Sequence, residues 1–95
     1  MQKVRIISSP REGDPPAQQK LWIGMEISVA MYDSTDPMEN VGEDMVWLDY
    51  EEVIAKIAVA GDAGYASFFR AMREHGARHA PGLLIHKKHC ESIAG

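Results

Sequence analysis

The residue types best suited to bind a metal are gathered near the C-terminal end of the chain. All four histidines and the only cysteine lie in the last 21 residues: His75, His79, His86, His89 and Cys90. Zn²⁺ prefers neutral imidazole and thiolate ligands, and four of them complete a tetrahedral site. The spacings His-x3-His and His-x2-His-Cys are similar to those of zinc ligands. This set therefore predicts a zinc-binding or metal-dependent protein as one interpretation of the sequence.

The expected secondary structure weakens the metal interpretation. If residues 83–93 form a strand, His86 and His89 point to opposite faces of the sheet. Gly76 is expected to end the preceding helix, so the two earlier histidines need not share a face. The chain also lacks the paired C-x2-C element of zinc ribbons. The first expectation is therefore no cofactor, with scattered surface histidines and a packed cysteine, and zinc is the alternative.

A second group of candidate residues lies in the alternating segment 21–32. Every odd position there carries a large apolar side chain, which is typical of a half-buried strand. Trp22, Glu26 and Tyr32 then lie on the opposite face, where large aromatic side chains can anchor a partner. We predict these three as partner-binding residues. The alternative is that helices cover this face and that Trp22 packs against Phe69 and its neighbours.

The first half of the chain is expected to contain two strands. Turn-forming residues separate them, and Pro16 suits the first position of a short helical turn. A twelve-residue strand is long, so a bend is expected near Gly24. The expected elements are a strand over 3–8, a loop over 9–16, a helical turn over 17–20 and a strand over 21–32.

The second half is expected to contain a pair of helices between strands. Asp49 and Asp62 are suitable N-cap residues for two successive helices, and Gly61 and Gly76 are suitable stop residues. The expected elements are a loop over 33–44, a strand over 45–48, helices over 49–60 and 62–75, and a last strand over 83–93. A short helix is the alternative for the last segment, because its apolar positions also fit helical spacing.

This order of elements predicts an α+β fold. The economical arrangement is a small curled antiparallel sheet, or an SH3-like barrel, with a helical hairpin inserted before the last strand. At 95 residues the chain is expected to form a single domain over 1–95. The comparison with an SH3-like barrel concerns architecture only and implies no function.

Charge is unevenly distributed along the chain. The formal net charge is −4. Residues 33–52 carry eight acids and no Lys or Arg, whereas residues 70–88 carry five bases and one acid. An acidic chain is poorly suited to neutralise phosphates, so nucleic acid is not expected as a partner. The two charged segments could instead meet across an interface between protein chains.

Two further properties bear on location. The apolar runs are too short to span a bilayer, so no membrane partner is expected. A single cysteine permits no internal disulfide, and the start of the chain lacks the long apolar stretch of a signal peptide. Together they predict a cytoplasmic protein.

The sequence carries no catalytic triad, no recognisable pair of catalytic carboxylates and no cofactor fingerprint. The leading prediction is therefore a small, soluble, non-enzymatic module that acts through protein–protein contact. Its partner is expected to be another protein or a second copy of the chain. The zinc-binding interpretation is the alternative.

Overall fold

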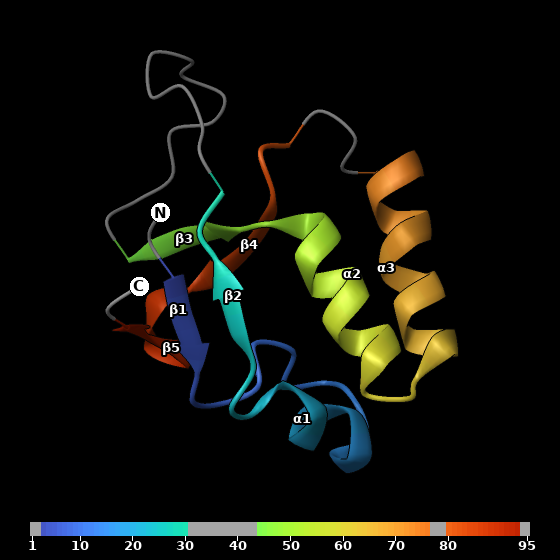
Figure 1. The fold of residues 1–95 in the computed structure, drawn as a ribbon, viewed down its shortest axis with the longest axis horizontal. Helices are drawn as coiled ribbons and strands as arrows, with labels where there is room; N and C mark the ends of the chain where they lie inside the picture. Colours follow the sequence, from blue (N-terminus) through green and yellow to red (C-terminus); the bar gives the residue numbers. More distant parts are fainter. Residues whose placement is uncertain (1–2, 31–43, 77–79, 94–95) are drawn as a thin grey trace.

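The computed structural model describes residues 3–30, 44–76 and 80–93, and within these ranges the chain has an α+β fold, which confirms the predicted class. The helices over 50–59 and 63–75 lie side by side on one side of the strands, and the short helix over 16–22 lies at the bottom of the view (Figure 1). The elements are β1 (Lys3–Ile6), α1 (Pro16–Trp22), β2 (Glu26–Ser28), β3 (Met45–Leu48), α2 (Tyr50–Val59), α3 (Ala63–His75), β4 (Leu83–His86), the 3-10 turn η2 (Lys87–His89) and β5 (Cys90–Ile93).

The strands form two small antiparallel sheets. The first has the order β2-β1-β5, and Val4 of the central strand lies opposite Ile27 on one side and Ser92 on the other. The second sheet pairs β3 with β4 and places Trp47 opposite Leu84. Side chains alternate across each strand, so one face of β1 is buried and the other is exposed.

Within the described ranges, one isolated bridge joins the two sheets at a corner. Val29, just after β2, pairs with Leu48 at the end of β3, and the Ala30 amide donates to the Trp47 carbonyl at 2.9 Å. Among the described residues neither sheet closes on itself, so the predicted SH3-like barrel is not supported. β2 has only three residues and therefore offers few backbone groups for pairing along both of its edges.

The helix pair begins and ends where the sequence predicts. The Asp49 carboxylate accepts from the Glu52 amide at 3.1 Å and starts α2. The Asp62 carboxylate accepts from the Tyr65 amide at 2.9 Å and starts α3. Between the helices Gly61 has a φ of 97°, which few other residues adopt, so the chain reverses within a short turn.

The segment 21–32 differs from its prediction. Helix α1 continues through Trp22, the chain turns at Gly24 with a φ of 88°, and the strand covers only Glu26–Ser28. The alternating pattern is misleading because the helix places Trp22 in the core, while Ile23 is left 58% exposed. Burial of the indole stabilises the helical arrangement more than an extended Trp22 on a half-exposed face would. The position of Tyr32 lies outside the described residues.

The C-terminal segment 83–93 contains two strands rather than the single one expected. Strands β4 and β5 belong to different sheets, and η2 connects them. The turn is held by backbone hydrogen bonds from the Lys87 amide to the Asp44 carbonyl at 2.7 Å and from the Ile7 amide to the His89 carbonyl at 2.9 Å. The helix pair therefore precedes the last two strands, not the last one alone.

The core lies between the sheets and the helix pair and draws on all three described α-helices. Its buried side chains are Val4, Ile6, Trp22, Ile27, Leu48, Tyr50, Val53, Ile54, Ile57, Tyr65, Ala66, Phe69, Leu83 and Ile85. The organisation of the whole chain as one domain stays a prediction. No helix in the described part of the chain is long and apolar enough to span a membrane.

Candidate functional site

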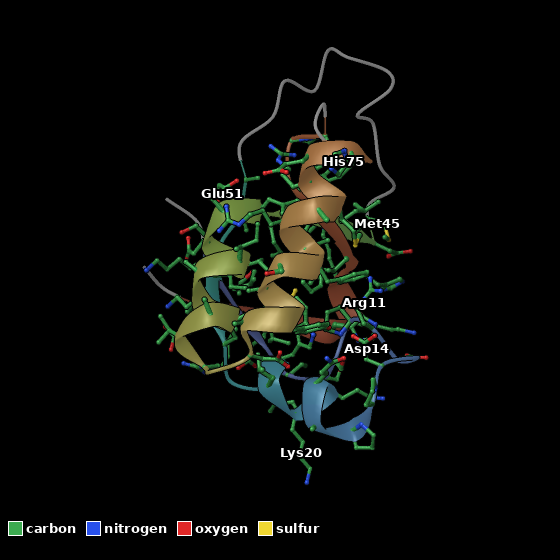
Figure 2. All side chains as sticks on the ribbon, turned by 90° about the vertical axis from the view of Figure 1, so that its right-hand side faces the viewer. Arg11, Asp14, Lys20, Met45, Glu51 and His75 are labelled. Atoms are coloured by element: carbon green, nitrogen blue, oxygen red, sulfur yellow. The ribbon has the colours of Figure 1, made fainter. Side chains whose placement is uncertain are left out.

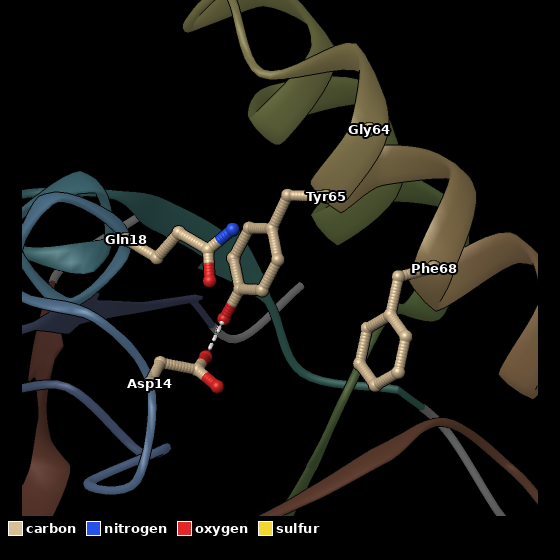
Figure 3. A pocket seen from close by; sticks show the side chains of 5 residues that line it. All are labelled: Asp14, Gln18, Gly64, Tyr65 and Phe68. Atoms are coloured by element: carbon tan, nitrogen blue, oxygen red, sulfur yellow. Dashed lines mark hydrogen bonds between the residues drawn. The ribbon is translucent and has the colours of Figure 1, made fainter.

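A cavity of about 290 Å³ opens between the loop that precedes α1, helix α1 itself and the N-terminal half of α3. It is lined by Asp14, Gln18, Gly64, Tyr65 and Phe68. Figure 3 shows Asp14 and Gln18 on one side of the Tyr65 ring and Phe68 on the other. We call it the Asp14 cavity. Its volume is near the lower end of the range for small-ligand sites, so it fits a side chain or a fragment.

The Tyr65 hydroxyl is fixed by two partners, the buried Trp22 and the partly buried Asp14. It accepts a hydrogen bond from Trp22 Nε1 at 2.9 Å and donates one to Asp14 Oδ2. Burial, followed by the hydrogen bond to the Asp14 carboxylate, raises the pKa of Tyr65 to about 12. The hydroxyl therefore stays protonated at neutral pH, and its only proton is already donated.

Asp14 is held from its own loop as well. Arg11 Nε donates to Asp14 Oδ2 at 3.3 Å, and Gln19 Nε2 donates to the Asp14 carbonyl at 2.6 Å. The Asp14 side chain is only 17% exposed. Both side-chain bonds use Oδ2, so within the described structure Oδ1 keeps its full capacity to accept.

Arg11 attaches this loop to α3. Its guanidinium carbon lies 5.2 Å from the centre of the Phe68 ring and 5.5 Å from that of Phe69, within the range of a cation–π contact. Figure 2 shows Arg11 and Asp14 beside α3. Arg11 is not among the residues that line the cavity. Arg11 therefore holds the Asp14 carboxylate through Oδ2 without lining the cavity itself.

Phe68 is the exposed wall of the cavity. Its side chain is 44% exposed, whereas its neighbour Phe69 is completely buried. The Phe68 and Tyr65 rings are parallel within 2°, with centroids 6.4 Å apart. An aromatic side chain that is exposed beside a preformed hollow resembles the anchor residues of protein interfaces. The five lining residues thus offer a carboxylate, an amide and two aromatic rings, which suit binding more than acid–base chemistry.

The described metal candidates lie in two parts of the fold. His75 lies at the C-terminal end of α3 (Figure 2). His86 directly precedes η2, His89 is its last residue and Cys90 begins β5, and the two imidazole centroids are 6.4 Å apart. His79 lies outside the described residues. Across residues 3–30, 44–76 and 80–93, no three His, Cys, Asp or Glu side chains gather to hold a metal ion.

Two of these side chains are already engaged. His86 Nδ1 accepts from the Lys88 amide at 3.1 Å, which leaves the proton of a neutral ring on Nε2. Cys90 Sγ donates to the Lys87 carbonyl at 3.6 Å, and burial raises the pKa of its thiol. In this arrangement His86 Nε2 offers no lone pair, and Cys90 favours the thiol over the thiolate that zinc requires.

His89 makes a contact that sequence reasoning missed. Its Nδ1 lies 2.9 Å from Ser8 Oγ, and the residue is only 7% exposed. Burial, and then the positive charge of Lys88, lowers the pKa of His89 below its ordinary value. We call Ser8, His86 and His89 the His89 corner. The Ser8–His89 bond ties the segment that follows β1 to η2.

The predicted partner-binding residues also lie apart. Trp22 is completely buried and meets Tyr65 and Phe69 edge to face, as in the alternative given above, so it offers no surface to a partner. Glu26 lies on the exposed face of β2, with a carboxylate oxygen 3.6 Å from Arg5. The role of Glu26 as a contact residue stays a prediction.

Comparisons with protein-family models, with curated proteins and with solved structures find no match for this chain. Function is therefore argued from the geometry and chemistry of the site itself.

Proposed function

We propose that this chain is a non-enzymatic protein-interaction module and that the Asp14 cavity is its contact site. The observation that supports this most directly is Phe68, which remains 44% exposed at the rim of a cavity of about 290 Å³. Aromatic side chains that stay half-exposed beside a hollow supply large contact area at low cost in side-chain entropy. The partner is another protein or a second copy of the chain.

The rigidity of the cavity also supports the proposal. Trp22, Tyr65 and Asp14 form a continuous chain of hydrogen bonds that fixes one wall. Tyr65 and Phe69 further pack edge to face, with centroids 4.9 Å apart. A preformed site needs little ordering when a partner binds, and this raises the affinity available from a small contact area.

The experiment places a photoreactive side chain at the rim. In Phe68→p-benzoylphenylalanine, irradiation of the cells that produce the protein should yield a covalent adduct of one discrete size. The matched control is Val59→p-benzoylphenylalanine, because Val59 is 88% exposed but belongs to the end of α2 and does not line the cavity. A partner seated on the cavity reacts at position 68 and not at position 59.

The outcomes separate the possibilities. An adduct at position 68 with the mass of two chains identifies self-association, and another discrete mass identifies a different protein. Either is expected to disappear when Gly64→Trp, which fills the cavity, is added. Equal labelling at both positions, or an adduct unaffected by Gly64→Trp, would contradict the proposal.

A further inference from the structure

We propose that the group received by the Asp14 cavity is a primary ammonium, presented by a lysine side chain of the partner. This inference rests on the proposed function and specifies its chemistry. It follows from the charge of the cavity wall, from the hydrogen bonds that are still available there and from the orientation of the aromatic rings.

The cavity wall presents acceptors. Asp14 is the only one of the five lining residues with a formal charge, and that charge is negative. The Tyr65 hydroxyl has already donated its proton to Asp14 Oδ2, while Oδ1 has no partner among the described residues. An ammonium group carries three donors and no acceptor, so it matches this wall, whereas a carboxylate or phosphate meets like charge.

Gln18 adds a second acceptor. Its side-chain amide makes no hydrogen bond to another described residue, and Figure 3 shows it beside the Tyr65 ring above Asp14. The carbonyl oxygen of that amide is therefore available to accept from a donor that enters the cavity. Two acceptors of this kind bind a primary ammonium without deprotonating it.

The aromatic walls suit a cation with an aliphatic stem. The faces of aromatic rings attract cations, and the Arg11 guanidinium already makes this contact with Phe68 at 5.2 Å. The Tyr65 ring is enriched in electron density by its hydrogen bond to a carboxylate. The methylene groups of a lysine stem would cover the exposed part of Phe68 while the ammonium reaches Asp14.

Arg11 sets a limit on the affinity. Its charge partly neutralises Asp14 through the 3.3 Å contact to Oδ2, so an isolated ammonium gains only part of the attraction of a lone carboxylate. We expect a small alkylammonium to bind with a Kd on the order of millimolar. The lysine of a partner protein gains further contact area from Phe68 and the surrounding surface.

The test compares three four-carbon compounds that differ in their polar end group. Backbone amide shifts of the full chain are recorded by NMR during titration with n-butylammonium, 1-butanol and butyrate at constant ionic strength. n-Butylammonium should perturb the amides around Asp14, Gly64 and Tyr65 and bind roughly tenfold more tightly than 1-butanol. Butyrate should leave these amides unchanged.

Asp14→Asn removes the charge and keeps the size of the side chain. It should reduce the preference for n-butylammonium over 1-butanol to roughly one, while 1-butanol still binds. Glu91→Gln is the matched control, because it removes one carboxylate from an exposed site on β5 that does not line the cavity, and it should keep the preference unchanged. Both variants are first shown by their amide spectra to be folded.

The failures can be told apart. If 1-butanol binds as tightly as n-butylammonium, or if Asp14→Asn keeps the preference, the ammonium inference is wrong and the cavity remains a contact site. If none of the three compounds perturbs the cavity at concentrations far above millimolar, both the inference and the proposed contact site are contradicted.

Discussion

Two of the contacts that attach the chain segment between β1 and α1 to the rest of the fold differ in what surrounds them. At the His89 corner, Ser8 meets a histidine that is only 7% exposed. At the other end, Asp14 meets Tyr65 of α3, and a cavity of about 290 Å³ lies beside the contact. Each attachment joins residues that are far apart in the sequence.

Both attachments are side-chain hydrogen bonds between distant parts of the chain, but they leave different groups available to a partner. In the His89 corner, the Nδ1 atoms of His86 and His89 both take part in hydrogen bonds. At the Asp14 cavity, Oδ1 of the carboxylate accepts no hydrogen bond from another described residue, and Phe68 is partly exposed. We therefore expect a structural role for the His89 corner and propose the contact role for the Asp14 cavity.

The largest expected effect comes from removal of the indole behind the cavity. Trp22→Ala should lower the free energy of unfolding by about 3–5 kcal/mol, because a completely buried aromatic side chain is replaced by an empty space. Urea unfolding followed by circular dichroism measures this. A loss below about 1 kcal/mol would show that α1 does not pack into the core as described.

Tyr65→Phe tests the hydrogen bonds of the cavity with little change in shape. It should lower the free energy of unfolding by about 1–3 kcal/mol, since Trp22 Nε1 loses its acceptor in a buried position. The same urea titration applies. The variant should also alter the amide shifts of Asp14, and an unchanged spectrum there would argue against the link between α3 and the loop.

The His89 corner should make stability depend on pH. The unfolded chain protonates a histidine near its ordinary pKa of 6.5, whereas burial lowers the pKa of His89 in the folded protein. The neutral ring therefore stabilises the fold fully above pH 6.5, and this contribution is lost as the pH falls below that value.

The measurement is the free energy of unfolding between about pH 5 and pH 7. One such group changes it by at most about 1.4 kcal/mol per pH unit. His89→Gln should flatten the profile relative to the unaltered chain. An identical profile for the two proteins would assign the dependence to other residues.

The smallest expected effect is at the exposed face of the first sheet. Glu26→Gln removes a carboxylate 3.6 Å from Arg5, and both side chains are nearly half exposed. Exposed ion pairs contribute about 0–1 kcal/mol, and Arg5 keeps its second partner Glu91 at 3.2 Å. A loss above about 2 kcal/mol in thermal or urea unfolding would mean that this face is more tightly packed than the structure shows.

Local signals predicted the helix pair well. The N-caps Asp49 and Asp62 act within one turn of their own position, so their role can be read from neighbouring residues. The strand predicted over 21–32 was wrong at its start, because the alternation of apolar and polar residues constrains the backbone less than the burial of Trp22 does. The division of residues 83–93 was missed because the turn η2 is held by backbone bonds to distant segments.

The cavity could not be predicted from the sequence either, because its residues come from distant segments of the chain. Asp14 and Tyr65 are 51 positions apart, and Ser8 and His89 are 81 positions apart. Only the fold brings each pair together. A partial signal was present, since Tyr65 and Phe68 are spaced to share one side of a helix. Nothing local indicated that Phe68 would be left exposed.

The most direct test of the central claim is photocross-linking at the two attachments side by side. Phe68→p-benzoylphenylalanine reports on the Asp14 cavity, and Lys88→p-benzoylphenylalanine reports on the His89 corner, where the Lys88 side chain is 60% exposed. A discrete adduct is expected from position 68 and none from position 88. A discrete adduct from position 88 alone would contradict the contact role of the Asp14 cavity and move the contact site to the His89 corner.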